Sequence, residues 1–341
     1  MNERLEDIAS AMVAAGKGIL AADESTSTIK KRFDNINLVS TEESRRDYRE
    51  LLFSAKDAMT NHISGVILYD ETLRQKAKDG TPLAQMIKAA GAVPGIKVDK
   101  GAVDLPGFPG EKITEGLDGL AARLKEYHDL GARFAKWRAV IDMADGLPTW
   151  GAVKANSQAL ARYAALCQQA GIVPIVEPEV LMDGPVATHD AARCHEVTHW
   201  VLKTVFDDLY DARVNLEGIV LKPNMVVAGK NCKTQASPEE VAERTLKVLK
   251  ATVPGAVPGI AFLSGGQSDE LATHHLSLMN MQALPWKLTF SYGRALQAAC
   301  LKAWGGKAEN LAAGQRAFTH RARMNGLACL GKYTPAHEKA A

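Results

Sequence analysis

Long hydrophobic runs are absent from the sequence: no apolar stretch approaches the roughly 18 residues that a membrane-spanning helix requires. Cysteine is scarce, and the five cysteines are scattered and odd in number, which is no disulfide framework and fits a reducing cytoplasm. An excess of one charge is also missing, because the net charge is +2 and acids and bases are mixed along the chain. Nothing in this charge pattern indicates nucleic acid or an anionic membrane as a partner. The first residues are too acidic for a signal peptide, so we expect a cytoplasmic protein.

What the sequence does contain is an alternation of short apolar strands with amphipathic helices, repeated about eight times. The predicted strands fall at residues 18–22, 65–69, 95–98, 133–137, 173–177, 219–221, 259–263 and 287–291. With 341 residues, 46% of them hydrophobic, the chain can build a single (β/α)8 barrel domain over residues 1–341. We expect an N-terminal helix over about residues 4–15 and a short polar tail from about residue 334. A doubly wound sheet is the alternative, but no Gly-x-Gly-x-x-Gly follows the first strand.

Two capping boxes mark points where helices are expected to begin. Ser40 is followed three residues later by Glu43, and Ser237 by Glu240, with Pro238 at the first helical position. In such a box the serine accepts a hydrogen bond from the third helical N–H, and the acidic side chain reaches back to the serine N–H. The sequence therefore predicts helices that start directly after each serine.

Lys222 stands at the end of the sixth predicted strand, directly before Pro223. Proline has no N–H for the ladder and restricts the preceding residue to extended angles, so the strand ends there. The stem of such a lysine lies in dry surroundings, and desolvation disfavours the charged ammonium, which makes a free amine available as a nucleophile. The alternative for this residue taken alone is a lysine whose amine snorkels from a strand end to the surface.

Polar residues gather at the predicted carboxyl ends of the strands, where the active site of a (β/α)8 barrel lies. They are Asp23, Ser25, Lys97, Lys136, Arg138, Glu177, Glu179, Lys222, residues 264–266, Ser291 and Arg294. Any one of these charges could belong to a structural ion pair. Three lysines and three carboxylates on one rim are harder to explain by structure alone, because inward-pointing charges have to be compensated.

The lysines and acids of this rim suit imine chemistry. An ammonium such as Lys136 near Lys222 favours the neutral form of the second lysine, which is how a cationic neighbour activates a lysine for Schiff-base formation. A carboxyl such as Glu177 can supply and recover the proton when a carbinolamine loses water. The sequence thus suggests a nucleophilic amine with an acid/base beside it.

Two further groups suit anions. Residues 264–266 offer backbone N–H groups after the seventh strand, and Arg294 offers a bidentate fork after the eighth. That is the usual phosphate site of this fold. Lys97 and Arg32 could hold a second anion across the barrel mouth.

Seven segments of the sequence closely resemble class I fructose-bisphosphate aldolases. They lie at residues 16–26, 95–101, 134–138, 173–179, 221–225, 262–268 and 290–297. The resemblance runs from about Leu5 to Pro335, and the seven motifs together are very specific. It implies a glycolytic lyase that reversibly cleaves fructose 1,6-bisphosphate to dihydroxyacetone phosphate and glyceraldehyde 3-phosphate through a lysine Schiff base.

The resemblance also implies a role for each matching residue. By it, Lys222 forms the Schiff base, Glu177 is the acid/base of carbinolamine dehydration, and Asp23 and Lys136 assist imine formation and C–C cleavage. The residues implied at the phosphate of the dihydroxyacetone half are Ser264, Gly265, Gly266, Ser291 and Arg294, with Gly293 beside them. Those implied toward the other phosphate and the rest of the substrate are Ser25, Thr28, Arg32, Lys97 and Arg138.

The same resemblance bears on cofactors and partners. Because the protonated imine is the electron sink, the class needs no metal and no other cofactor, and its relatives are commonly homotetramers. Vertebrate members end in a flexible tail with a terminal tyrosine that assists proton transfer, whereas no aromatic residue follows Tyr333 here, so we expect that step to run differently. Thr28 stands where relatives often have serine, and it keeps the hydroxyl.

A rival pattern is His195-Glu196-x-x-His199, a formal match to the zinc helix of metallopeptidases, with Glu217 downstream as a possible third ligand. The same stretch is also the expected amphipathic helix between the fifth and sixth strands, which would place both histidines on the outer ring. A non-catalytic interaction protein on the same fold is the remaining alternative. It is disfavoured because the set of rim residues is complete, and unused inward charges are costly.

Overall fold

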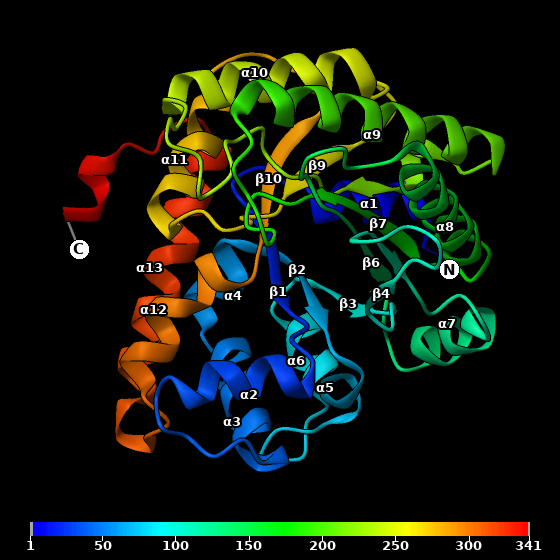
Figure 1. Ribbon diagram of the computed structural model, residues 1–341. Helices are drawn as coiled ribbons and strands as arrows, with labels where there is room; N and C mark the ends of the chain where they lie inside the picture. Colours follow the sequence, from blue (N-terminus) through cyan, green and yellow to red (C-terminus); the bar gives the residue numbers. More distant parts are fainter. Residues whose placement is uncertain (1–2, 340–341) are drawn as a thin grey trace.

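Eight parallel strands close into a barrel in the computed structural model, which describes residues 3–339 (Figure 1). The barrel strands are β1 (Gly18–Ala22), β2 (Ile63–Leu68), β3 (Val93–Lys97), β6 (Phe134–Ile141), β7 (Val173–Val180), β8 (Val220–Leu221), β9 (Gly259–Phe262) and β10 (Lys287–Tyr292). Their order around the barrel is β1-β10-β9-β8-β7-β6-β3-β2, so each strand pairs with its neighbours in chain order. The closed barrel confirms the predicted fold and excludes the doubly wound sheet.

Helices other than α1, which precedes β1, follow the strands along the chain and form the outer layer (Figure 1). They are α1 (Leu5–Met12), α2 (Thr26–Asp34), α3 (Glu42–Phe53), α4 (Lys56–Asn61), α5 (Asp70–Arg74), α6 (Leu83–Ala89), α7 (Leu120–Asp129), α8 (Trp150–Gln169), α9 (Ala191–Asp211), α10 (Pro238–Thr252), α11 (Asp269–Met279), α12 (Arg294–Trp304) and α13 (Leu311–Cys329), with 3-10 turns η1 (Leu216–Gly218), η2 (Ala308–Asn310) and η3 (Pro335–Lys339). Within residues 3–339, none of these helices combines the length and the apolar character needed to cross a bilayer.

The barrel interior is filled from its amino-terminal end by α1. Ile8 and Met12 of this helix belong to one buried cluster with the inward-facing Ile19 of β1 and Phe134 of β6. The ring of Phe134 occupies the space beside Gly95 so closely that a Cβ on Gly95 would lie 2.3 Å from it. The interior is therefore a packed apolar core at this end. Polar side chains that point into the barrel can lie only at the opposite, carboxyl-terminal rim.

The register of the strands brings charged residues together on that rim. Lys97 of β3 pairs with Lys136 of β6, and Arg138 of β6 pairs with Glu177 of β7. Parallel strands point the same way, so residues beyond each strand end gather at one face of the barrel. The sequence pattern located this face correctly.

Most strand bounds differ from the expectation by one or two residues, and the largest differences are at β6 and β7. β6 and β7 continue past residues 137 and 177, because their pairing persists to Ile141 and Val180. β8 begins one residue later than expected, because Ile219 is the C-cap of η1, and it ends at Leu221 as predicted. An antiparallel hairpin of β4 (Ala102–Asp104) and β5 (Lys112–Thr114), which the sequence analysis did not predict, lies between β3 and β6 in the chain.

The first predicted capping box was wrong by one residue. The N-cap of α3 is Thr41, whose hydroxyl accepts from Ser44 N at 3.0 Å, while Thr41 N donates to Ser44 Oγ at 2.9 Å. Ser40 instead accepts a hydrogen bond from the Arg45 guanidinium at 3.3 Å, which occupies its side chain. The second predicted N-cap is confirmed: Ser237 accepts from the N–H of Glu240 at 3.2 Å.

Candidate active site

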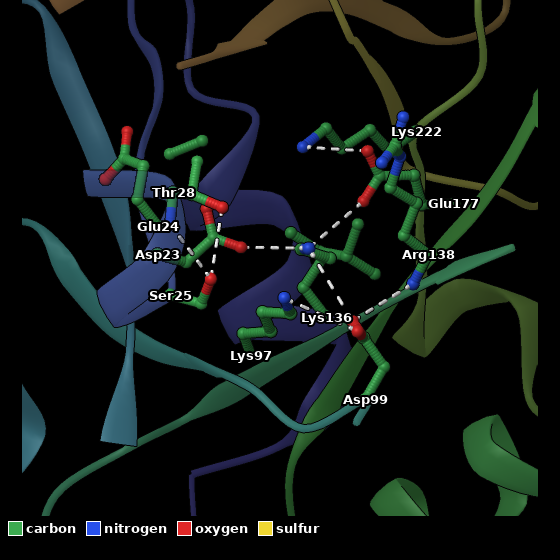
Figure 2. Close-up of polar contacts among 12 residues, drawn as sticks. Asp23, Glu24, Ser25, Thr28, Lys97, Asp99, Lys136, Arg138, Glu177 and Lys222 are labelled. Carbon is green, nitrogen blue, oxygen red and sulfur yellow. Dashed lines mark hydrogen bonds and ion pairs between the residues drawn. The ribbon is translucent and has the colours of Figure 1, made fainter. Parts of the chain in front are cut away.

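Lys222, Glu177 and Lys136 follow one another across three neighbouring strands at the carboxyl-terminal rim (Figure 2). Lys222 Nζ lies 3.1 Å from Glu177 Oε1, and Glu177 Oε2 lies 3.7 Å from Lys136 Nζ. Each of the three side chains is at most 6% exposed. The carboxylate of Glu177 therefore stands between the side-chain nitrogens of Lys222 and Lys136. An electrostatic effect of Lys136 on Lys222 acts together with that of the negative charge of Glu177.

The surroundings of Lys222 fix its position. Its backbone N–H donates to the carbonyl of Val176 at 2.8 Å, which extends the ladder one residue beyond β8. After Pro223 the side chain of Asn224 accepts from Val180 N at 3.1 Å and donates to Thr198 at 3.0 Å. The chain that follows the lysine is thus tied to β7 and to α9, so the amine projects from a rigid base.

Lys136 is held in its charged form by three acids. Its Nζ lies 2.8 Å from Asp23 Oδ2 and 3.7 Å from both Asp99 Oδ2 and Glu177 Oε2. Burial disfavours the ammonium, but these carboxylates outweigh burial and raise the pKa of Lys136 above its ordinary value. Lys136 is therefore a fixed cation and a hydrogen-bond donor, and not a base.

Asp23 is the counterpart of this fixed cation. Burial opposes its ionisation, yet the ammonium groups of Lys136, Lys222 and Lys97 together hold the pKa of Asp23 below its usual value. Asp23 is consequently a carboxylate over the whole neutral range, and it can accept hydrogen bonds from the hydroxyl groups of a bound molecule.

A cavity of about 240 Å³ opens at this rim. Eight of the predicted site residues line it: Asp23, Ser25, Thr28, Arg32, Lys97, Lys136, Arg138 and Gly293. The remaining seven do not line it: Lys222, Glu177, Ser264, Gly265, Gly266, Ser291 and Arg294. The structure thus divides the predicted set into an open pocket and a group deeper in, or beside, the barrel mouth.

The open pocket has a cationic wall. Lys97 Nζ lies 3.5 Å from Asp99 Oδ1, and Arg32 is paired with the buried carboxylate of Glu24. Ser25 is the N-cap of α2 and accepts from Thr28 N at 3.4 Å. The amino end of this helix adds a partial positive charge to the two cations, so the pocket suits an anion.

A second group suited to an anion follows β9. The carbonyl of Ser264 accepts the backbone N–H of Gln267 at 3.2 Å, and the carbonyl of Gly265 accepts from Arg294 Nη2 at 2.9 Å. Gly265 has a φ of +56°, which glycine adopts readily. Among the described residues no hydrogen bond uses the N–H groups of residues 264–266. With both carbonyls occupied and the N–H groups available, this loop offers donors to an anion.

The end of β10 adds two residues to this second group. Ser291 is 1% exposed, and its hydroxyl has no hydrogen-bond partner within residues 3–339. Tyr292 and Gly293 separate Ser291 from Arg294, and a Cβ on Gly293 would lie 3.7 Å from the Arg32 guanidinium. The two anion-binding groups therefore meet at Gly293.

Arg138 is paired with a buried acid, as Arg32 and Lys97 are, but its side chain is more exposed than either. Its guanidinium pairs with Glu179, and its side chain is 44% exposed. Its backbone N–H donates to Asp99 Oδ2 at 3.4 Å. Arg138 thus borders the pocket with its charge already compensated by a buried acid.

Three charged residues of the site escaped the sequence analysis. Asp99, two positions after Lys97, contacts both Lys97 and Lys136, and the rule of strand ends could have found it. Glu24 follows Asp23 directly and was passed over for that neighbour. Arg49 belongs to α3 and donates to Glu24 Oε2 at 2.7 Å. The helical pattern of α3 does not indicate that one of its arginines contacts the end of β1.

The zinc pattern lies on one of the outer helices and not on a barrel strand. His195 and His199 belong to α9, while Glu217 belongs to η1, beyond the other end of that helix. Within residues 3–339 no three His, Cys, Asp or Glu side chains are arranged to hold a metal ion. The pattern is accounted for by an outer helix of the barrel.

The site combines a nucleophile, an acid/base and groups suited to anions. A buried amine has a carboxylate within proton-transfer distance, next to a fixed ion pair of Lys136 and Asp23. Anion-binding groups flank them on two sides. Such a site can attack a carbonyl, dehydrate the adduct, and hold a molecule that carries an anionic group at each end.

Comparisons with known proteins give concordant results. The sequence matches the family "Fructose-bisphosphate aldolase class-I" over residues 4–341. A probable fructose-bisphosphate aldolase class 1 of Xanthomonas axonopodis pv. citri is 57% identical over 333 residues, 97% of this chain and 98% of that protein. A non-muscle type fructose-bisphosphate aldolase of Lethenteron camtschaticum is 53% identical over 336 residues, 98% and 92% of the two chains. The crystal structure of fructose-bisphosphate aldolase from Plasmodium falciparum, in complex with TRAP and a small-molecule inhibitor, superposes with a TM-score of 0.93 at 50% identity, over 97% of this chain and 95% of that one.

Proposed function

Since this chain belongs to the class I fructose-bisphosphate aldolase family, we propose that its active-site nucleophile is Lys222. The protein is a lyase of glycolysis that reversibly cleaves fructose 1,6-bisphosphate to dihydroxyacetone phosphate and glyceraldehyde 3-phosphate. The observation that supports Lys222 is its buried amine at 3.1 Å from the carboxylate of Glu177. A nucleophile with an acid/base at hydrogen-bond distance is the arrangement that imine formation requires.

Imine formation divides the work between these two residues. The Lys222 amine attacks the substrate ketone, and the carbinolamine hydroxyl leaves as water after accepting a proton. Glu177 lies where it can give that proton and later recover it. The resulting protonated imine withdraws electrons, so the bond between C3 and C4 breaks and its electron pair forms an enamine on the half bound to Lys222. The proton of the C4 hydroxyl passes to the Glu177 carboxylate, which gave up its own proton in the dehydration, and the other half leaves as an aldehyde.

Asp23 and Lys136 have the role of orienting the substrate. Asp23 remains ionised, because the neighbouring ammonium groups lower its pKa, and a carboxylate that weakly binds protons holds a hydroxyl better than it removes one. Lys136 remains a cation and can donate to an oxygen that gains negative charge. Their contact at 2.8 Å keeps both groups in place before substrate arrives.

Two anion sites account for a substrate with two phosphates. The N–H groups of residues 264–266, with Ser291 and Arg294, are placed to hold the phosphate of the half that stays bound to Lys222. Lys97 and Arg32, with Ser25 and Thr28 at the amino end of α2, line the pocket for the phosphate that leaves with the aldehyde.

We further infer that no metal ion or other cofactor takes part, since the imine itself serves as electron sink. A cytoplasmic location and a homotetramer are proposed from the family resemblance. Full activity after dialysis against excess EDTA is the expected result for the first inference. Sedimentation equilibrium at several protein concentrations tests the subunit number.

Borohydride reduction in the presence of dihydroxyacetone phosphate, followed by peptide mapping, tests the nucleophile. Reduction converts an imine into a stable secondary amine, so the label identifies the lysine that formed it. We expect the label on Lys222 and none in Lys222→Ala. A label on Lys97 or Lys136 would overturn the assignment.

A further inference from the structure

A buried histidine that takes no part in the proposed chemistry is linked to the loop of residues 264–266. His275 lies on α11 and is 2% exposed. Its Nδ1 lies 2.6 Å from Oε1 of Gln267. Gln267 in turn donates from Nε2 to the carbonyl of Ser264 at 3.0 Å and contacts Met225 Sδ at 3.7 Å. One side-chain amide therefore connects His275 to the backbone of the loop.

The direction of these hydrogen bonds is determined by their partners. The amide nitrogen of Gln267 faces a carbonyl and a thioether, which both accept, so the amide oxygen faces His275. An amide oxygen cannot donate, and Nδ1 of His275 therefore carries the proton. Burial lowers the pKa of His275 to about 4, helped by His274 and opposed by Glu239, so the ring is neutral near pH 7. Its Nε2 has no partner among the described residues.

The helix that carries His275 is anchored independently of the loop. Tyr292 of β10 donates its hydroxyl to the carbonyl of Ala272 at 3.0 Å. Arg321 of α13 donates to the carbonyl of Asp269 at 3.2 Å. α11 is thus attached to a barrel strand and to a second helix, and it gives His275 a fixed reference position.

The Gln267 side chain matters because of the geometry of the peptide unit. The carbonyl of Ser264 and the N–H of Gly265 belong to one planar trans peptide and point in opposite directions. Holding the carbonyl in place therefore aims the N–H of Gly265. Two donors of Gln267 converge on that carbonyl, its backbone N–H and its side-chain amide, and the Nδ1–H of His275 holds the oxygen of the same amide.

We propose that His275 is a positioning residue for phosphate binding. Through Gln267 it orients the peptide between Ser264 and Gly265, so that the Gly265 N–H is directed at the phosphate of the ketone half before the substrate arrives. The inference rests on the proposed role of residues 264–266 as that phosphate site. It adds a buried group that touches neither substrate nor Lys222 to the residues that determine affinity.

Two substitutions of His275 separate its hydrogen bond from its bulk. His275→Leu removes the donor, whereas His275→Asn keeps an N–H at the same branch of the side chain and can still donate to Gln267. In the condensation direction, we expect His275→Leu to raise the KM for dihydroxyacetone phosphate by about 3- to 10-fold, the usual effect of losing one neutral hydrogen bond. The KM for glyceraldehyde 3-phosphate should stay unchanged, because that phosphate binds at the other pocket. His275→Asn should restore the lost affinity, and the inhibition constant of inorganic phosphate should follow the same order.

Matched controls exclude a general loss of structure. His274→Leu makes the same change one residue earlier, at a side chain with no hydrogen bond to the loop, and should leave both KM values unchanged. Gln267→Met removes the amide that connects His275 to the carbonyl of Ser264. If His275→Leu folds poorly, Gln267→Met should still show the rise in the KM for dihydroxyacetone phosphate without a change in the KM for glyceraldehyde 3-phosphate. Thermal unfolding of each variant shows whether the fold is retained.

Three outcomes would overturn the inference: equal increases of both KM values, an equal effect of leucine and asparagine, or no effect of either variant. Arg294→Ala distinguishes this failure from failure of the phosphate site itself. If Arg294→Ala weakens dihydroxyacetone phosphate while His275→Leu does not, only the positioning role is wrong. If Arg294→Ala has no effect either, the proposed phosphate site is wrong.

Discussion

Glu177 of β7 lies beside Lys222, which directly follows the neighbouring strand β8. Glu177 Oε1 is 3.1 Å from Lys222 Nζ, and both side chains are almost completely buried. The second oxygen of the same carboxylate is 3.7 Å from another ammonium, that of Lys136. Glu177 is thus placed to exchange a proton with whatever is attached to Lys222. It can do so without leaving the charged environment that Lys136 supplies.

Replacing the carboxylate of Glu177 should separate binding from chemistry. Glu177→Gln keeps the shape of the side chain but cannot deliver and recover a proton, so imine formation should slow by about 10²–10⁴-fold, the usual contribution of a general acid–base group. Equilibrium binding of the substrate should change little. Rapid-quench trapping with borohydride measures the rate of imine formation directly. A normal trapping rate with slow turnover would move the role of Glu177 to a later step.

Replacing Lys136 should change the pH dependence of the reaction on its acid side. The pKa of Asp23 is low because Lys136, Lys222 and Lys97 outweigh the effect of burial. In Lys136→Met one of these charges is gone while burial remains, so the pKa of Asp23 must rise. Because Asp23 acts as a carboxylate, activity then falls at a higher pH than in the wild type as the solution is acidified. The acid limb of kcat/KM against pH measures the shift, and an unchanged limb would show that Asp23 is not needed in its charged form.

Removing Glu24 should destabilise the protein more than removing its partner. Glu24 is buried and neutralises two cations, Arg32 and Arg49, the latter also buried. Glu24→Gln leaves Arg49 without a counter-charge, which should lower the free energy of unfolding by about 3–5 kcal/mol. The double variant Glu24→Gln/Arg49→Met should recover much of this loss. Urea unfolding of these two variants and of Arg49→Met gives the coupling, and additive losses would contradict a buried ion pair of this importance.

The sequence predicted the barrel and the rim because each depends on local pattern. Alternating apolar strands and helices predict the barrel, and in a parallel barrel every strand end reaches the same face. Lys222 and Glu177 were assigned to this face in this way, by their position after Leu221 and Val176.

Contacts between side chains of different elements could not be predicted in the same way. The pairing of Arg49 with Glu24 joins α3 to the end of β1, and the link from His275 to Gln267 joins α11 to the loop directly before it. Neither leaves a periodic signal. The misplaced capping box shows a local limit too, since Ser40 and Thr41 are both acceptable N-caps and only the contact with Arg45 decides between them.

Lys97 offers the sharpest test of the two-ended phosphate site. Its amine lines the pocket and lies 3.5 Å from Asp99 Oδ1, with 21% of the side chain exposed. If it binds the phosphate that leaves with the aldehyde, Lys97→Ala should reduce kcat/KM for fructose 1,6-bisphosphate by about 10–100-fold, as expected for one charge-assisted contact. Fructose 1-phosphate has no group at that site, so its kcat/KM should barely change.

Arg294→Ala is the matched control for Lys97→Ala, because both substrates carry the phosphate that Arg294 is placed to hold. This variant should weaken the bisphosphate and the 1-phosphate alike. Steady-state kinetics of both variants on both substrates, with thermal unfolding to confirm the fold, completes the comparison. Lys97 also helps to keep Asp23 ionised, and that effect would penalise both substrates equally. Equal losses in Lys97→Ala would therefore assign this lysine to the charge balance of Asp23, and the phosphate of the aldehyde half would have to be held by Arg32 and the amino end of α2.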